Sequence, residues 1–118
     1  MMTDKTEKGN KGEALAADFL IKKGFEVVER NYRYKHAEID LIVKKGNWLI
    51  FVEVKARSST AFGHPETFVD RDKVKKILEG ADHYIFEIDW QGNVRYDIVS
   101  VLFKYNNTEV YHIEDAFY

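Results

Sequence analysis

The fold of this chain follows from residues 38–55, which read EIDLIVKKGNWLIFVEVK. Two runs of β-branched and aromatic residues, 38–43 and 48–54, are typical of β-strands. They flank Gly46 and Asn47, and Gly-Asn is a dipeptide that favours a two-residue hairpin turn. We therefore predict an antiparallel hairpin that closes at this turn.

A two-residue turn determines which residues of the hairpin lie opposite each other. Counting outward from the turn places Asp40 opposite Glu53, and opposite residues share one face of a sheet. One face is then apolar and is expected in the core; it carries Ile39, Leu41, Val43, Ile50, Val52 and Val54. The other face has ionisable groups at the open end of the hairpin, namely Glu38, Asp40, Glu53 and Lys55. An odd loop length would separate Asp40 from Glu53.

The segments around the hairpin alternate between helical and strand patterns. We predict a helix over residues 9–23, a strand over 25–29, a second helix capped by Asp70 or Asp72, and strands over 94–103 and 109–113. A loop through Gly63 and Pro65 precedes the second helix. The order αβββαββ indicates an α/β fold with a mixed sheet flanked by helices. Residues 1–8 are expected to form a polar tail and residues 9–118 one domain.

The composition excludes several classes of protein. The chain has 118 residues, 45% of them hydrophobic, and no cysteine, which excludes a disulfide scaffold and a thiolate zinc site. No apolar run approaches the roughly 20 residues of a membrane helix, and the N-terminus is not a secretory signal. We expect a cytoplasmic protein without a membrane partner. A net charge of −2 excludes a purely electrostatic nucleic-acid binder but leaves room for a local basic groove.

The acidic pair at the open end of the hairpin suggests a cation site. Opposite Cβ atoms lie about 4.5–5.5 Å apart, so Asp40 and Glu53 can hold one Mg²⁺, which prefers oxygen ligands. Lys55 projects from the same face and can reach a metal-bound water or a phosphate oxygen. These residue types suit phosphodiester hydrolysis. A plain cluster of solvated ion pairs is the alternative, although burying carboxylates among apolar strand residues is costly without a counter-ion.

Glu13 is a third candidate carboxylate. On a helical wheel it falls about 20° from Leu20, near the middle of the apolar stripe of the first helix. It is either an N-terminal carboxylate favoured by the helix dipole or a ligand that points inward.

Several blocks of this sequence resemble a known family. They are Gly12-Glu13-Ala14, Asn31-Tyr32-Arg33, 38–42, 51–57 and Phe62-Gly63. Together they resemble the YraN-like family of uncharacterised bacterial proteins, which is similar to the restriction-endonuclease-like PD-(D/E)xK superfamily and to archaeal Holliday-junction resolvases.

The resemblance implies a restriction-endonuclease-like αβββαβ core with four site residues. Asp40 would be the first acid of the motif, Glu53 the second, Lys55 its lysine and Glu13 the acid of the first helix. It also implies Mg²⁺ (or Mn²⁺ as a substitute), a DNA substrate that is branched or duplex, and a homodimer. Ala37 departs from the glycine that the family commonly has before Glu-Ile-Asp.

Other charged residues are secondary candidates. Arg57, Lys44, Lys45 and Lys73 are candidate phosphate contacts, although the lysines of the second helix also fit an ordinary solvated face. His36, which precedes the acidic strand, could assist proton transfer, although none of the four histidines is singled out as catalytic. Glu38, at the open end of the hairpin, is the other secondary candidate.

Three functions follow from these patterns. The first is a metal-dependent endonuclease that hydrolyses DNA phosphodiesters. The second is a non-catalytic nucleic-acid-binding or scaffold protein on the same fold. The third is a protein-interaction module that uses exposed aromatic residues of the last hairpin.

Overall fold

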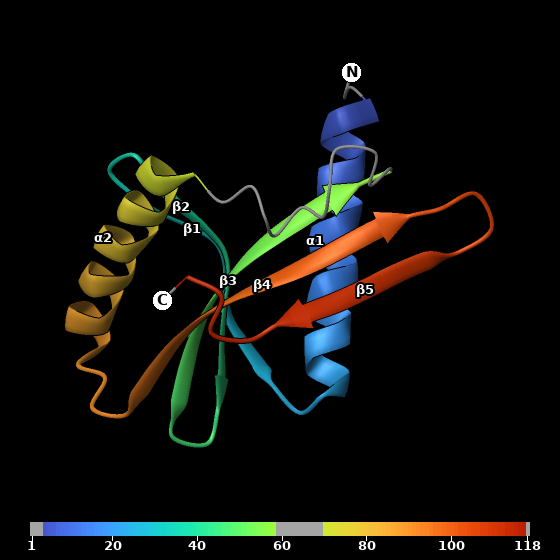
Figure 1. The fold of residues 1–118 in the computed structure, drawn as a ribbon. Coiled ribbons are helices and arrows are strands. Elements are labelled where there is room, and N and C mark those ends of the chain that lie inside the picture. The colour runs from blue at the N-terminus through green and yellow to red at the C-terminus, as the bar shows by residue number, and fades with distance from the viewer. Residues whose placement is uncertain (1–3, 59–69, 118) are drawn as a thin grey trace.

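The computed structural model describes residues 4–58 and 70–117. Its middle layer is a five-stranded sheet in the order β1-β2-β3-β4-β5, and the helices α1 and α2 cover opposite faces of it (Figure 1). The elements are α1 (Asp4–Lys22), β1 (Glu26–Tyr34), β2 (Ala37–Lys45), β3 (Trp48–Arg57), α2 (Arg71–Ile88), β4 (Asn93–Phe103) and β5 (Thr108–Ile113). Strands β3 and β4 are parallel and the other neighbours are antiparallel. This confirms the predicted α/β fold with an αβββαβ core and a mixed sheet.

The central hairpin has the predicted turn and register. Lys45 pairs with Trp48 across the turn, and Gly46 adopts a positive φ of 57°, which favours glycine. The ladder between β2 and β3 ends at the pair Leu41–Val52. Beyond that pair, a side chain of β2, rather than its backbone, accepts a hydrogen bond from the backbone of β3.

Two apolar clusters fill the space between the sheet and the helices. The cluster under α1 contains Ala16, Ala17, Leu20, Leu41, Val43, Ile50 and Val52. The cluster under α2 contains Ile42, Phe51, Ile77 and Tyr84, and also Ile39. The prediction that Ile39 shares a face with Leu41 was therefore wrong. The start of β2 no longer pairs with β3, so its faces do not follow those of the hairpin, and Ile39 packs instead near Gly80 of α2.

Several element boundaries differ from the prediction. Helix α1 begins at Asp4 rather than Gly9, so residues 4–8 of the predicted tail are helical. Strand β1 continues to Tyr34 instead of ending at Glu29. Helix α2 is capped by Asp70, one of the two predicted caps, whose Oδ1 accepts a hydrogen bond from the Asp72 backbone N–H at 2.9 Å.

Two further expectations concern the loop and the membrane. The loop predicted through Gly63 and Pro65 lies outside the described residues. Within the described ranges, no helix has the length and apolar character needed to cross a membrane.

Candidate functional site

The end of the β2–β3 ladder brings Asp40 and Glu53 together. Oδ2 of Asp40 accepts a hydrogen bond of 2.8 Å from the Val54 backbone N–H, which orients this carboxylate toward β3. Glu53 is only 4% exposed, and its charge acts directly on Asp40. The predicted acidic pair is therefore assembled.

Helix α1 adds Glu13 to the pair because it passes very close to β3. A Cβ at Gly12 would lie 2.7 Å from Cβ of Ala56, so this approach requires glycine. The neighbouring Glu13 lies within hydrogen-bonding reach of Asp40. Burial raises the pKa of the Glu13 carboxyl, although its hydrogen bond to Asp40 opposes the rise. Of the two readings of Glu13, the structure supports the side chain that points inward.

A lysine of α2 reaches the same site. Nζ of Lys73 lies 2.7 Å from Oε1 of Glu53. Although burial lowers the pKa of Lys73, the hydrogen bond to Glu53 and its charge raise it overall, so the ammonium is charged at neutral pH. Lys73 thus contacts the buried acid while its side chain stays 45% exposed, so it also belongs to the solvated face of α2.

The second oxygen of Glu53 is the most unusual atom of the site. Oε2 is buried and has no hydrogen-bond partner in the described part of the chain. A buried carboxylate oxygen without a partner carries a large desolvation cost. An oxygen in this state is suited to accept a cation or a proton.

Burial is the main cause of the pKa shifts in this cluster. Burial, reinforced by the charge of Glu53, raises the pKa of Asp40 from 3.8 to about 8, while the Val54 N–H acts in the opposite direction. Burial lowers the pKa of Lys55, and the positive charge of Lys73 adds to this effect. In the absence of a metal, Asp40 therefore binds a proton at neutral pH.

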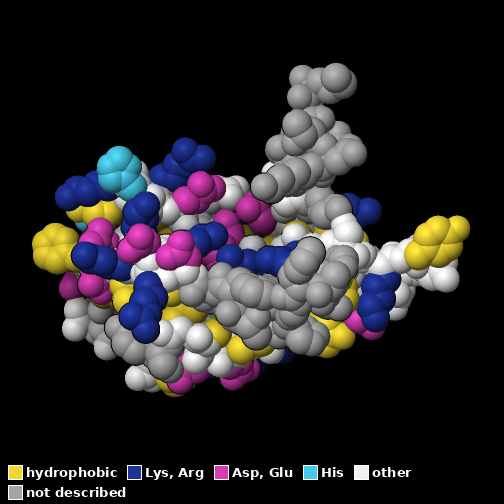
Figure 2. Space-filling model, turned by 45° about the horizontal axis from the view of Figure 1, so that its top comes forward, with side chains coloured by type: hydrophobic (Ala, Val, Ile, Leu, Met, Phe, Trp, Pro, Cys, Tyr) yellow, Lys and Arg dark blue, Asp and Glu magenta, His cyan; other side chains and the backbone are white. Residues whose placement is uncertain are grey.

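A cleft of about 460 Å³ opens beside the cluster between β2 and the first turns of α2. Its lining residues are His36, Glu38, Asp40, Asp70, Asp72, Lys73, Lys76 and Ile77. The two secondary candidates, His36 and Glu38, thus lie in the cleft next to the acidic pair. Acidic and basic side chains are mixed over the surface that carries α2, as Figure 2 shows.

The predicted phosphate contacts divide into two groups. Arg57 is the last residue of β3, which continues beyond the predicted end at Val54. Lys44 and Lys45 lie at the opposite end of the hairpin, beside the turn. There Lys45 donates a hydrogen bond of 2.9 Å to the backbone oxygen of Lys23, and Lys44 lies over the ring of Trp90. The structure does not bring these two lysines to the site.

The donor atoms fit a hard divalent cation. Asp40, Glu53 and Glu13 offer carboxylate oxygens, the ligands that Mg²⁺ and Mn²⁺ prefer. Oε2 of Glu53 is a candidate ligand atom that has no hydrogen-bond partner in the described residues. Across residues 4–58 and 70–117, however, no three His, Asp or Glu side chains are arranged as a finished metal-binding set. A metal would therefore have to draw the carboxylates inward.

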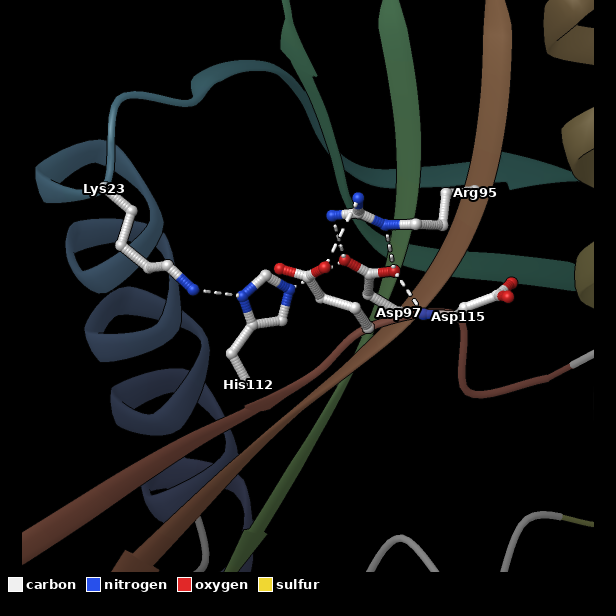
Figure 3. Close-up of polar contacts among 6 residues, drawn as sticks. Lys23, Arg95, Asp97, His112 and Asp115 are labelled. Atoms are coloured by element: carbon white, nitrogen blue, oxygen red, sulfur yellow. Dashed lines mark hydrogen bonds and ion pairs between the residues drawn. The ribbon is translucent and has the colours of Figure 1, made fainter.

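A second polar network, which was not predicted from the sequence, is centred on Asp97 of β4 (Figure 3). Asp97 is fully buried and accepts hydrogen bonds from Arg95 at 2.9 Å and from the Asp115 backbone N–H at 3.0 Å. Nε2 of His112 lies 2.7 Å from its Oδ2, and Nδ1 of the same ring lies 2.7 Å from Nζ of Lys23. The network therefore ties β4 and β5 to the end of α1.

This network has a structural role, because it connects β4 and β5 to the end of α1. Burial raises the pKa of Asp97, but the hydrogen bonds of His112 and Arg95 outweigh it and hold the pKa below its ordinary range. A single carboxylate within an apolar strand, in the run VRYDIVSV (94–101), was the signal that could have identified it.

These observations define a class of protein: an α/β chain with an αβββαβ core and a carboxylate–lysine cluster where β2 separates from β3. The chain belongs to the family described as Uncharacterised protein family UPF0102, whose model matches residues 12–101. This confirms the resemblance to the YraN-like family.

Relatives of this family match over nearly their full length. The UPF0102 protein of Christiangramia forsetii is 41% identical over 117 residues, which cover 99% of this chain and 98% of that protein. The UPF0102 protein of Bacteroides thetaiotaomicron is 40% identical over 119 residues, covering 99% and 97%. The UPF0102 protein of Thermodesulfovibrio yellowstonii is 39% identical over 112 residues, covering 95% and 96%.

Proposed function

We propose that this protein is a Mg²⁺-dependent endonuclease that hydrolyses DNA phosphodiesters, including those of branched DNA. The observation that carries the proposal is the buried Glu53 carboxylate, whose Oε2 has no partner in the described chain, beside the carboxyl of Asp40. Carboxylates can hold a cation that assists phosphodiester hydrolysis, and the resemblance described above implies Asp40, Glu53 and Lys55 for this reaction.

Each residue of the cluster has a distinct role in the proposed reaction. Asp40 and Glu53 would hold the cation, with Glu13 as the third oxygen donor on the α1 side. The bound Mg²⁺ would supply Lewis acidity and neutralise the negative charge that develops on the phosphate. Lys55 would donate a hydrogen bond to a non-bridging phosphate oxygen and so position the phosphodiester.

The roles of the backbone and the cleft follow from the same geometry. The Val54 N–H keeps Asp40 in place during turnover, because it donates to Oδ2. The cleft beside α2 gives a strand access to the carboxylates. Water attacks the phosphorus and gives up one proton to the solvent, the P–O ester bond to the leaving oxygen breaks, and that oxygen takes up a proton from the solvent.

The test is cleavage of branched, duplex and single-stranded DNA with Mg²⁺ or Mn²⁺. We expect cleavage by the wild type, and a loss of at least 100-fold in Asp40→Asn and Lys55→Ala. Lys44→Ala is the matched control, since this lysine lies at the turn end of the hairpin. If the wild type shows no cleavage above the two site variants on every substrate, the proposal is wrong.

One observation favours a second candidate, a non-catalytic nucleic-acid-binding protein. The ammonium of Lys73 already neutralises Glu53 at 2.7 Å, as an internal substitute for a cation would. This candidate predicts DNA association that weakens with salt, together with no binding of Mn²⁺. A calorimetric titration of the wild type with Mn²⁺ separates the two candidates.

A further inference from the structure

The position of Lys73 bears on how the site would change when a metal enters. Its ammonium lies 2.7 Å from Oε1 of Glu53, a carboxylate that is 4% exposed. The lysine side chain itself is 45% exposed, so its stem leads from the buried acid to the solvent. Lys73 therefore has a route by which it can leave the carboxylate without unfolding α2.

The charges around Lys73 act in opposite directions. Lys73 lies close enough to Lys55 for their charges to oppose each other, and both lie near Glu53. A single ammonium satisfies Oε1 and leaves Oε2 without a partner in the described chain. A divalent cation carries twice the charge and takes oxygen ligands from several groups at once, so it can satisfy both Glu53 and Asp40.

On these grounds we propose that Lys73 is an exchangeable counter-cation: it holds Glu53 in the metal-free protein, leaves when a divalent cation binds, and then pairs with a phosphate of the nucleic acid. The inference rests on the proposed metal site. Lys73 lines the same cleft as Asp40, so a displaced ammonium remains where a strand would enter. Lysine suits this role because its charge is compact and its stem is flexible.

This exchange couples the binding of metal to the binding of nucleic acid. When the metal binds, one positive charge is released toward the phosphates; when a phosphate holds that charge, Glu53 is free for the metal. Each ligand then strengthens the binding of the other by the same factor. Without the lysine, the metal meets no competitor and this part of the coupling is lost.

The experiment measures the Kd of Mn²⁺ by calorimetry, with and without a phosphorothioate DNA duplex. The variants are Lys73→Met, Lys73→Arg and Lys76→Met; Lys76 lines the same cleft and serves as the matched control. Without DNA, we expect Lys73→Met to bind Mn²⁺ about three- to tenfold more tightly than the wild type, since a partly exposed ion pair no longer competes. Lys73→Arg keeps a competing charge and Lys76→Met keeps the competitor, so both should bind as the wild type does.

The outcomes separate this inference from the proposed function. We expect DNA to tighten Mn²⁺ binding in the wild type and to do so less in Lys73→Met. If the wild type binds Mn²⁺ but Lys73→Met binds equally or more weakly, the exchange is overturned and the metal site stands. If only Lys73→Met binds Mn²⁺, the lysine is a permanent occupant, which also overturns the exchange. If no variant binds, the metal site and the proposed function fail together.

Discussion

Replacing Asp40 by asparagine should stabilise the metal-free protein at alkaline pH. The Asp40 carboxyl has its pKa raised from 3.8 to about 8, because it is buried beside Glu53. The native state therefore holds this proton more tightly than the unfolded chain does. By linkage, the contribution of Asp40 to stability falls as the pH rises from about 4 to about 8. Asparagine carries no charge at any of these pH values and removes the penalty.

The magnitude follows from the size of the shift. A rise of about four pKa units corresponds to roughly 6 kcal/mol at pH 8 and above. Relaxation of the site and approach of water relieve part of that cost, so we expect Asp40→Asn to be more stable by about 2–3 kcal/mol at pH 8. Asparagine also keeps an oxygen that can accept the Val54 N–H and adds a donor for Glu53.

The assay is urea unfolding at a series of pH values from 4.5 to 8.5, with EDTA present. The free energies of unfolding of the wild type and of Asp40→Asn should converge near the acid end and separate as the pH rises. Asp18→Asn is the control, because Asp18 is exposed on α1 and should show no such separation. Curves that run parallel, or a wild type that gains on the variant with rising pH, would refute the reasoning.

Two further predictions concern the framework of the site. Asp97→Asn breaks the hydrogen bonds of a buried carboxylate with Arg95 and His112, so it should cost about 3–5 kcal/mol of unfolding free energy at pH 7. Because the pKa of Asp97 is held low, this contribution to stability is present above about pH 4 and is lost as the pH falls through the lowered value. Acid titration of both proteins by circular dichroism should therefore show their stabilities converging. A cost below about 1 kcal/mol at pH 7 would contradict a central role of Asp97 in the network. Gly12→Ala puts a Cβ 2.7 Å from a side chain of β3 and should destabilise by about 1–3 kcal/mol, whereas Gly9→Ala, which meets nothing within 4 Å, should gain up to about 1 kcal/mol from helix propensity. Thermal unfolding compares the two, and equal shifts in Tm would count against the close approach of α1.

The hairpin could be predicted from sequence because its information is local. A Gly-Asn dipeptide between two β-branched runs specifies a turn, and the turn determines the register for as long as the strands remain paired. The observed pairs Lys45–Trp48 and Leu41–Val52 follow this count. The same count placed Asp40 with Glu53, and the two carboxyls do meet.

The face on which Ile39 is buried could not be predicted from the residues next to it in the sequence. Alternation along a strand predicts which face a residue lies on only while the strand is paired on both sides. Strand β2 pairs with β3 from Leu41 onward, and the residues before Leu41 have no partner in β3. Its continued pairing with β1 and the approach of α2 at Gly80 then decide where Ile39 is buried. The periodicity of the sequence does not predict where α2 lies relative to this strand.

The ion pair between Lys73 and Glu53 was not predicted, for a related reason. A helical wheel tells which residues share a side of α2, and by that criterion Lys73 belongs with exposed lysines. It does not tell which end of the helix lies near β3. Lys73 is in the first turn, and that turn lies beside the buried acid. Tertiary placement therefore changed a surface lysine into a partner of Glu53.

The end of the β2–β3 ladder explains why the carboxyl group of Asp40 is buried beside β3. Once β2 stops pairing, the N–H of Val54 needs another acceptor, and leaving such a group unpaired would cost about 1–3 kcal/mol if it were buried. Oδ2 of Asp40 is that acceptor. The same carboxyl group thus closes the gap in the sheet and lies beside Glu53. The backbone bond offsets part of the cost of burying the acid, which lets the fold keep a carboxyl with a pKa of about 8 where a cation would bind.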